Sequence, residues 1–350
     1  MLLLDYSLPD HLKALPFKSK NIRSFQPQDA SAQHDRTTTR YHYTSATALM
    51  AILGAKNNEN GAVRFTDARY MNDRSEHMYF VKLLLEYMEE HRAEYQYCQD
   101  VINELLFKDQ PYSTDDYLSL SVPEISDATM DNYVFTKPRH FIFCLSKNDD
   151  SLHMWNYYIH NGNYQGYNFG IRTYDFLSNF DQETNVKNDP ISFYCGDVLY
   201  SKGKHDKEIE TLCKTLEYAC ERTKHIPNMI QSVTTYLWQY IECCGLFFKD
   251  KSFADEEEYR IVIQFNESLA QSNISAYFQN KHRNIEYNYF ERNGILVPFL
   301  SVPLAKRAVK QVTMAPIMEK RIASFSMKEF LDANGYNNVD VKQSEIPIRF

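Results

Sequence analysis

FADEEEYRIVIQF, residues 253–265, joins a cluster of carboxylates to a clear strand pattern. From residue 259 to residue 265 the side chains alternate with period two, as in a strand with one face in a core. If the extended backbone begins at Glu256, then Glu256, Glu258 and Arg260 leave the same face, about 7 Å apart per step. Because like charges raise one pKa and an adjacent arginine lowers it, this row predicts a carboxylate site. A solvated strand end with an Arg–Glu pair is the alternative.

Composition sets the limits of the fold and of the partners. The chain has 350 residues and 43 % hydrophobic residues, enough for a sizeable core in one large domain or two. Its net charge of -8 argues against non-specific binding of the chain to the phosphate backbone of nucleic acids, which requires clustered lysine and arginine. A local groove lined by basic residues is still compatible with this negative net charge.

Cysteine usage and hydropathy predict a cytoplasmic protein. The seven cysteines include no CxxC pair and no zinc spacing, which is typical of reduced cytosolic thiols. No window approaches eighteen apolar residues, so we expect no membrane span and no membrane partner. The N-terminus lacks the apolar core and cleavage site of a signal peptide.

The order of the expected elements indicates a mixed α+β fold with largely antiparallel sheets and flanking helices. We expect residues 1–39 to be an arm or linker, because residues 17–39 are polar, and residues 40–350 to be one domain with a helical insertion around 205–250. Asn293-Gly294 between two apolar runs predicts a hairpin. Further strands are expected at 40–44, 63–66, 141–146, 167–172, 256–265, 311–315 and 339–350, and helices after Ser45, after Asp150 or Ser151, and over 318–334.

Aromatic and imidazole side chains are further candidates for residues of a functional site. In a strand over 40–44, His42 points away from Tyr41 and Tyr43 and shares a face with Thr44. A histidine near a strand end is more often structural than functional, unless it meets another polar cluster. Trp155 and Tyr158 lie on the helix after residue 151, where Trp155 is expected in the core and Tyr158 is a candidate for stacking on a flat heterocycle.

The carboxylates also allow a second class of chemistry. Asp73, Glu76, Glu256 and Glu258 together are able to hold a divalent metal, which would make the chain a metal-dependent phosphodiesterase or nuclease. Asp73 and Glu76 also form a capping-box pattern at the start of a helix. The phosphate-binding loop, the dinucleotide fingerprint and the HExxH zinc motif are all absent from the sequence.

Six short motifs occur in a fixed order along the chain: Tyr41-His42-Tyr43-Thr44-Ser45, Asn72-Asp73-x-x-Glu76, FIFCLS at 141–146, Met154-Trp155-x-x-Tyr158, Glu256-x-Glu258-Tyr259-Arg260 and Ser344-Glu345-Ile346-Pro347-Ile348-Arg349. In this order they resemble the bacterial domain-of-unknown-function family 2971 over about residues 40–350. A family of this kind implies no activity.

A second, more distant resemblance is to the ADP-ribosyltransferase superfamily, and it implies a split sheet and NAD as a substrate. By this resemblance His42 holds the NAD ribose, Tyr158 stacks on nicotinamide, Glu258 is the catalytic carboxylate and Glu256 orients or deprotonates the acceptor. One departure is that Tyr43 follows His42 where many members have glycine. The remaining residues that the resemblance places around NAD are Tyr43, Thr44, Trp155 and Arg260.

The ADP-ribosyltransferase resemblance, the carboxylates and the tyrosines lead to three hypotheses. Cleavage of the ribose–nicotinamide bond passes through an oxocarbenium-like state that a carboxylate stabilises, so the first is an NAD-consuming ADP-ribosyltransferase. It would be an effector of the toxin or antiviral-defence type that modifies a nucleic acid or a protein and needs no metal. The second is the metal-dependent phosphodiesterase. The third is a non-catalytic sensor whose tyrosine-lined pocket binds a nucleotide. Residues 109–139 and 268–284 are candidate lids.

Overall fold

The structure is a computed structural model that divides into two compact units. The first unit comprises residues 1–24, 71–136 and 196–253, and the second comprises residues 25–70, 137–195 and 254–350. The residues that the structure describes are 22–24, 36–54, 61–71, 76–106, 139–159, 165–178, 190–224, 233, 237, 240, 241, 243–270, 272–279, 284–316 and 318–347.

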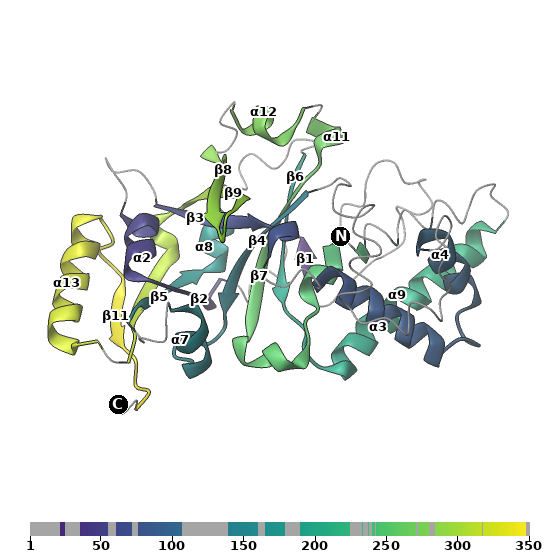
Figure 1. The fold of residues 1–350 in the computed structure, drawn as a ribbon, viewed down its shortest axis with the longest axis horizontal. Helices are drawn as coiled ribbons and strands as arrows, with labels where there is room; N and C mark the ends of the chain where they lie inside the picture. Colours follow the sequence, from purple (N-terminus) through teal and green to yellow (C-terminus); the bar gives the residue numbers. More distant parts are fainter. Residues whose placement is uncertain are drawn as a thin grey trace. The chain divides into compact units, whose positions relative to one another are not determined.

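The first unit is mainly helical in its described part, apart from the short strand β1 (Ile22–Ser24). Its long helices are α3 (Glu76–Glu90), α4 (Gln96–Leu106) and α9 (Lys202–Thr223), and α9 packs against both of the others (Figure 1). α9 accounts for part of the helical insertion expected around residues 205–250. No helix in the described ranges of either unit is both long enough and apolar enough to cross a membrane.

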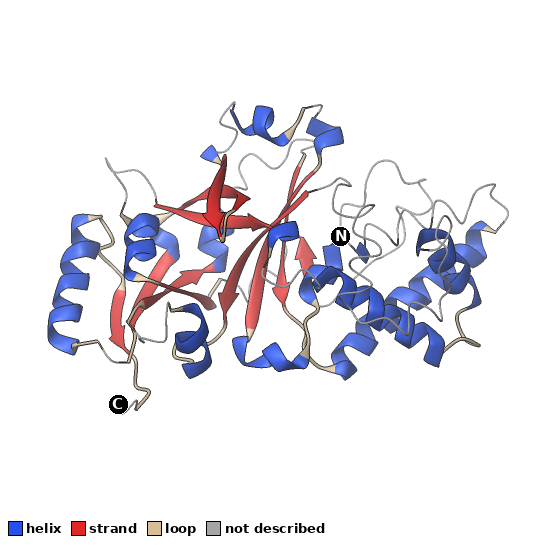
Figure 2. Cartoon of the chain, viewed as in Figure 1, coloured by secondary structure: helices blue, strands red, loops and turns tan. Residues whose placement is uncertain are grey.

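The second unit contains a mixed, mostly antiparallel sheet with helices around it, which confirms the predicted α+β class (Figure 2). The order of the strands in its main path is β6-β7-β4-β2-β5-β10-β11, and β11 is parallel to β10. The strands are β2 (Thr39–Thr44), β3 (Gly61–Asp67), β4 (Arg139–Ser146), β5 (Tyr167–Arg172), β6 (Ile191–Asp197), β7 (Glu258–Phe265), β8 (Glu286–Arg292), β9 (Ile295–Leu304), β10 (Val309–Met314) and β11 (Asp340–Gln343).

The sheet branches along one side of β4. On its other side β4 pairs with β7 over its whole length, from Arg139 to Ser146. On the branching side β4 pairs with β3 at Phe141 and Ile142, and with β2 through Tyr41 and Ser146. β3 continues to β9 and β8, whereas β2 continues to β5 and β10. Strand β4 therefore joins two groups of strands, β3-β9-β8 and β2-β5-β10-β11, into one sheet with β7.

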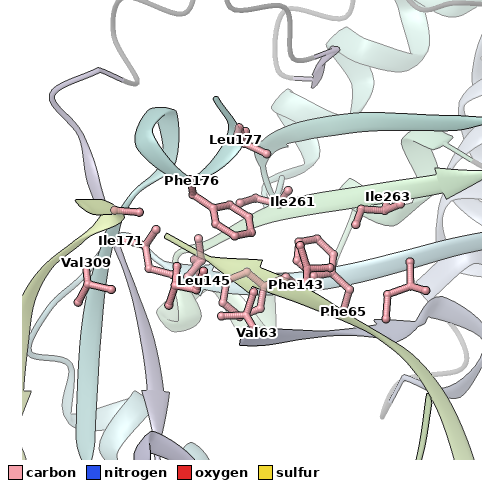
Figure 3. Close-up of a cluster of buried hydrophobic side chains, with 14 of the residues drawn as sticks. Val63, Phe65, Phe143, Leu145, Ile171, Phe176, Leu177, Ile261, Ile263 and Val309 are labelled. Atoms are coloured by element: carbon pink, nitrogen blue, oxygen red, sulfur yellow. The ribbon is translucent and has the colours of Figure 1, made fainter. Parts of the chain in front are cut away.

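The main hydrophobic core lies on one face of these strands. Figure 3 shows side chains of β3, β4, β5, β7 and β10 meeting Phe176 and Leu177 of α8 (Thr173–Leu177). On β7 the alternate residues Tyr259, Ile261, Ile263 and Phe265 all belong to this cluster and are at most 1 % exposed. The period-two prediction for this strand is confirmed, and it fixes which face of β7 carries the other side chains.

A smaller core covers the opposite face where β2 meets α7 (Leu152–Tyr158). Trp155 of α7 is fully buried, and its ring lies 4.6 Å from the ring of Tyr43 in an edge-on contact. Met154, Ile159 and Ala315 complete this cluster. The two apolar clusters thus lie on the two faces of one sheet, since Tyr43 pairs with Asn168, and Asn168 alternates along β5 with the main-core residues Phe169 and Ile171.

Several predicted ends of elements are confirmed. Ser45 caps α2 (Ala46–Leu53), where its Oγ accepts a hydrogen bond from the N–H of Ala48 at 3.2 Å. Asn293 and Gly294 both have positive φ, 51° and 79°, as the tight hairpin turn between β8 and β9 requires. The remaining helices of the second unit include α11 (Glu267–Ala270), α12 (Ile274–Gln279) and α13 (Lys320–Ala333).

Two predicted strand boundaries are wrong. β7 begins at Glu258, because residues 251–256 form the 3₁₀ helix η6 (Lys251–Glu256) and Glu257 adopts a φ of 43°. The last strand, β11, covers Asp340–Gln343 and does not continue through residues 344–347, where Ser344 and Glu345 bond to the Asp150 side chain; residues 348–350 of the predicted strand lie outside the described residues. The start of α3 is described from Glu76, so the predicted cap Asp73 lies outside the described residues.

Candidate functional site

A polar site lies at the N-terminal end of strand β7, on the sheet face opposite the main core. In the β4–β7 ladder Glu258 pairs with Ser146 and Arg260 pairs with Cys144. Directly paired residues of antiparallel strands point to the same face, and Tyr259, which lies between Glu258 and Arg260, points into the main core. The side chains of Glu258 and Arg260 therefore project from the sheet face that α7 covers.

Glu258 and Arg260 form a buried ion pair. Arg260 Nη2 donates to Glu258 Oε2 at 2.9 Å, and the two side chains are 0 % and 8 % exposed. A guanidinium with no exposed surface requires such a partner, because isolated charges are costly to bury. The sequence-based pairing of these two residues is thus present, in a buried rather than a solvated setting.

Glu256 reaches the same site from outside the strand. Its side chain accepts a hydrogen bond from the Tyr158 hydroxyl at 2.8 Å, and the residue is 6 % exposed. The backbone is held by Ser146, whose Oγ donates to the Glu256 carbonyl at 2.9 Å, and by the N–H of Lys147, which donates to the Glu257 carbonyl at 3.0 Å. These contacts with the end of β4 fix the bend that turns the Glu256 side chain toward α7.

Tyr158 is a fixed hydrogen-bond donor in this site. Burial, followed by the charges of Glu256 and Glu258, raises the pKa of the Tyr158 hydroxyl far above its usual value. The hydroxyl therefore keeps its proton throughout the physiological range. The residue as a whole is 44 % exposed, so its ring presents surface to solvent while its hydroxyl is held.

The N-terminus of α7 is anchored by Ser151 and Asp150. Ser151 Oγ accepts from the N–H of Met154 at 3.4 Å, and Trp155 Nε1 donates to Asp150 Oδ1 at 2.8 Å. Asp150 also binds the C-terminal segment, since it accepts from Ser344 Oγ at 2.6 Å and from the N–H of Glu345 at 2.8 Å. These bonds set the position of the helix whose last residue is Tyr158.

His42 lies on the other face of the sheet. It pairs with Phe169 in the β2–β5 ladder, and its ring is 5.0 Å from the ring of Phe143 and 5.4 Å from that of Phe169. Its Nδ1 lies 3.1 Å from the Cys144 carbonyl, and since a carbonyl only accepts, Nδ1 carries the proton. Burial lowers the pKa of His42, against the opposing effect of this hydrogen bond.

The structure therefore brings together only part of the predicted set. Tyr158, Glu256, Glu258 and Arg260 converge, whereas His42 packs against the aromatic side chains of the main core. The other residues predicted near NAD have structural surroundings: Trp155 and Tyr43 form the smaller core, the Tyr43 hydroxyl bonds to the Asn148 carbonyl and the Ser151 N–H, and Thr44 is buried next to Tyr167 on β5.

Sequence reasoning missed Ser146, which aligns Glu256, and Asp150, which joins α7 to residues 344–345. The FIFCLS pattern ends at Ser146, so a polar residue at the end of an apolar strand was the available signal. Asp150 was considered only as an alternative helix cap. Its bonds to residues almost two hundred positions away leave no local pattern.

Within the described part of the chain, no group of three or more His, Cys, Asp and Glu side chains is arranged to hold a metal ion. Asp73 lies outside the described residues, and so does the side chain of Glu76. The four-carboxylate metal site thus stays a prediction without geometric support. The carboxylates that are described have a tyrosine hydroxyl and a guanidinium as partners.

Comparison with family models gives one match, over residues 154–261, to "Protein of unknown function (DUF2971)". The match covers less than half of the chain and is shorter than the resemblance expected over residues 40–350, but it includes both Met154-Trp155-x-x-Tyr158 and Glu256-x-Glu258-Tyr259-Arg260. All four convergent residues of the site therefore lie within the matched region.

No curated protein and no solved structure matches the chain. The comparisons thus give no support to the resemblance to ADP-ribosyltransferases.

Proposed function

We propose that the chain is an NAD-consuming, ADP-ribosyltransferase-like enzyme whose reaction takes place beside Tyr158, Glu256 and Glu258. The observation that supports this most strongly is the hydrogen bond between the Tyr158 hydroxyl and Glu256, next to the buried Glu258–Arg260 pair. An aromatic ring with exposed surface and two oriented carboxylates are the groups that glycosyl transfer from a nucleotide needs.

In the proposed reaction the bond between ribose C1′ and the nicotinamide nitrogen breaks, and its electron pair leaves with nicotinamide. The positive charge that develops on the ribose is stabilised by Glu258, whose own negative charge is held in place by Arg260. Tyr158 offers its ring to the nicotinamide, and its hydroxyl keeps the ring at a fixed distance from Glu256. The acceptor then forms a bond to C1′ and its proton passes to Glu256.

The proposed site differs from the one that the sequence resemblance implies. His42 and Thr44 point away from it, and Tyr43 and Trp155 are packed in the smaller core, so none of these four residues has a role in the proposed reaction. The acceptor is proposed to be a nucleic acid or a protein, and the enzyme to be a cytoplasmic effector of the toxin or antiviral-defence type. The proposed reaction involves no metal.

Release of nicotinamide tests this proposal. The full chain is incubated with NAD, and free nicotinamide is measured by chromatography for the wild type, for Glu258→Gln and for Glu257→Gln. Glu257 is the exposed neighbour of Glu258 and makes Glu257→Gln a matched control. We expect release by the wild type and by Glu257→Gln and a loss of at least about 100-fold in Glu258→Gln. Equal release by all three proteins, or none by the wild type, would refute the proposal.

One observation favours a second function, that of a nucleotide sensor without turnover. Both carboxylates already have partners in the chain, Glu256 in Tyr158 and Glu258 in Arg260, which suits a rigid binding surface as well as a reacting one. A sensor would be stabilised by NAD or a related nucleotide in thermal unfolding without releasing nicotinamide. A Glu258→Gln change would then alter the affinity only.

A further inference from the structure

Arg40 is a buried guanidinium on the core-side face of β2. It pairs with Ile171 in the β2–β5 ladder, so the two side chains share the face of the main core. The residue is only 5 % exposed. Its guanidinium carbon lies 4.6 Å from the centre of the Tyr259 ring, which comes from β7. One flat face of the guanidinium is thus covered by an aromatic ring.

This arginine has no anionic partner within the described part of the chain. Its Nε is buried and makes no hydrogen bond to any described residue. Arg260, which among the described residues is also more than nine-tenths buried, has a carboxylate partner at 2.9 Å. Arg139, which is less buried, has both Asp67 at 2.5 Å and the Tyr287 hydroxyl at 3.1 Å. Arg40 differs from both, because its flat face is covered by the Tyr259 ring while no described oxygen accepts a hydrogen bond from its guanidinium.

The chemistry of a guanidinium makes this arrangement costly without a ligand. Arginine does not lose its proton in proteins, so Arg40 cannot become neutral as a buried lysine or carboxylate does. A cation–π contact attracts the cation but does not replace its hydrogen bonds. With one face on Tyr259, the N–H donors point outward in the plane of the guanidinium, where they match two oxygens of one planar or tetrahedral anion.

We propose that Arg40 anchors a binding site for an oxyanion, a phosphate or carboxylate group carried by a small molecule, on the core-side face of β2. This site lies on the opposite face of the sheet from Glu258 and does not depend on the proposed transfer reaction. His42, two residues further along the same face, is neutral because burial lowers its pKa, so Arg40 supplies the positive charge of the site. Tyr259 holds the guanidinium in the orientation that presents its donors.

Thermal unfolding with simple anions tests the site. The melting temperature of the full chain is measured in inorganic phosphate, in acetate and in chloride at equal ionic strength, for the wild type and for Arg40→Leu. We expect phosphate or acetate to raise the wild-type melting temperature above its value in chloride by about 3 °C or more at saturation. We expect Arg40→Leu to lose this rise. Whichever anion gives the larger shift identifies the group that the site accepts.

Two further variants keep the test decisive. Arg64→Leu is the matched control, because Arg64 also stacks on aromatic rings, those of Phe290 and Phe299, but is exposed, and it should keep the full anion effect. Arg40→Lys, which keeps the charge but not the planar fork, should keep only part of it and serves if Arg40→Leu does not fold. The absence of an anion effect in the wild type, or the same effect in Arg40→Leu or Arg40→Lys as in the wild type, would overturn the proposal.

Discussion

Replacing Arg260 with methionine should destabilise the protein in a strongly pH-dependent way. The change removes the guanidinium but keeps most of the side-chain volume, so Glu258, whose side chain is 8 % exposed, stays buried without the Arg260 charge beside it. Breaking a buried pair by removing one member costs about 3–5 kcal/mol. The buried glutamate can avoid part of this cost by taking up a proton.

Protonation sets an upper limit to the loss, and this limit changes with pH. Bringing a carboxyl with an ordinary pKa of about 4.3 to its neutral form at pH 7 costs about 3.7 kcal/mol, at 1.36 kcal/mol for each pH unit. At pH 5 the same step costs about 1 kcal/mol. In the variant the folded-state pKa of Glu258 lies above the unfolded value, so the destabilisation is small below pH 4.3 and grows as the pH rises.

Urea unfolding of the wild type and Arg260→Met at pH 5 and at pH 7 measures this difference. We expect a loss of roughly 3.5 kcal/mol at pH 7 and roughly 1 kcal/mol at pH 5. In the double variant Glu258→Gln, Arg260→Met, which removes both charges, most of the pH dependence should disappear. A loss below about 1 kcal/mol at pH 7, or the same loss at both pH values, would show that Glu258 is not confined with Arg260 as described.

Three further changes test other parts of the site and its support. Tyr158→Phe should cost about 1.5 kcal/mol in urea unfolding, because its hydroxyl donates to a carboxylate, whereas Tyr157→Phe, on the 75 % exposed neighbour, should cost almost nothing. Asp150→Asn should lower stability by about 2 kcal/mol and increase proteolysis at the C-terminus, since its new amide N–H₂ faces backbone and side-chain donors; unchanged proteolysis would count against this anchor. Burial acts to raise the pKa of Asp67, but the hydrogen bonds and charges of Arg69 and Arg139 outweigh it and lower that pKa. Asp67→Asn should therefore lose about 3 kcal/mol at pH 7 and progressively less as the pH falls below about 4, which acid titration of both proteins would measure.

Local patterns were sufficient for the elements around the site. The alternation from Tyr259 to Phe265 identified the strand and its core face, and Asn293-Gly294 identified a hairpin that requires positive φ at both residues. Ser45 and Ser151 cap helices as expected. Each of these features depends on residues close together in the sequence, for which side-chain periodicity and backbone geometry are strong constraints.

The composition of the site was only partly predictable, because it depends on which face of the sheet each strand presents. The alternation in β2 correctly placed His42 opposite Tyr41 and Tyr43, but the sequence does not state which of the two faces α7 covers. Tyr43 packs on α7, and His42 therefore points into the main core. Tyr158 reaches the carboxylates because it comes from α7 itself.

The position of Glu256 could not be obtained from strand periodicity. An extended backbone through Glu256 would place its side chain in a row with Glu258, but the 3₁₀ helix before β7 and the positive φ of Glu257 break that row. The side chain is directed instead by bonds from Ser146 and Lys147 at the end of β4 to the backbone at Glu256 and Glu257. These are contacts between strands that lie more than one hundred residues apart.

The rate of nicotinamide release from NAD by two single variants, Glu258→Gln and His42→Gln, is the most direct test of the claim that the reacting groups lie on the α7 face of the sheet. The account predicts that the Glu258 variant loses the activity and that the His42 variant, provided it remains folded by circular dichroism, keeps most of the wild-type rate. Full activity in the first variant together with loss in a folded second variant would contradict it.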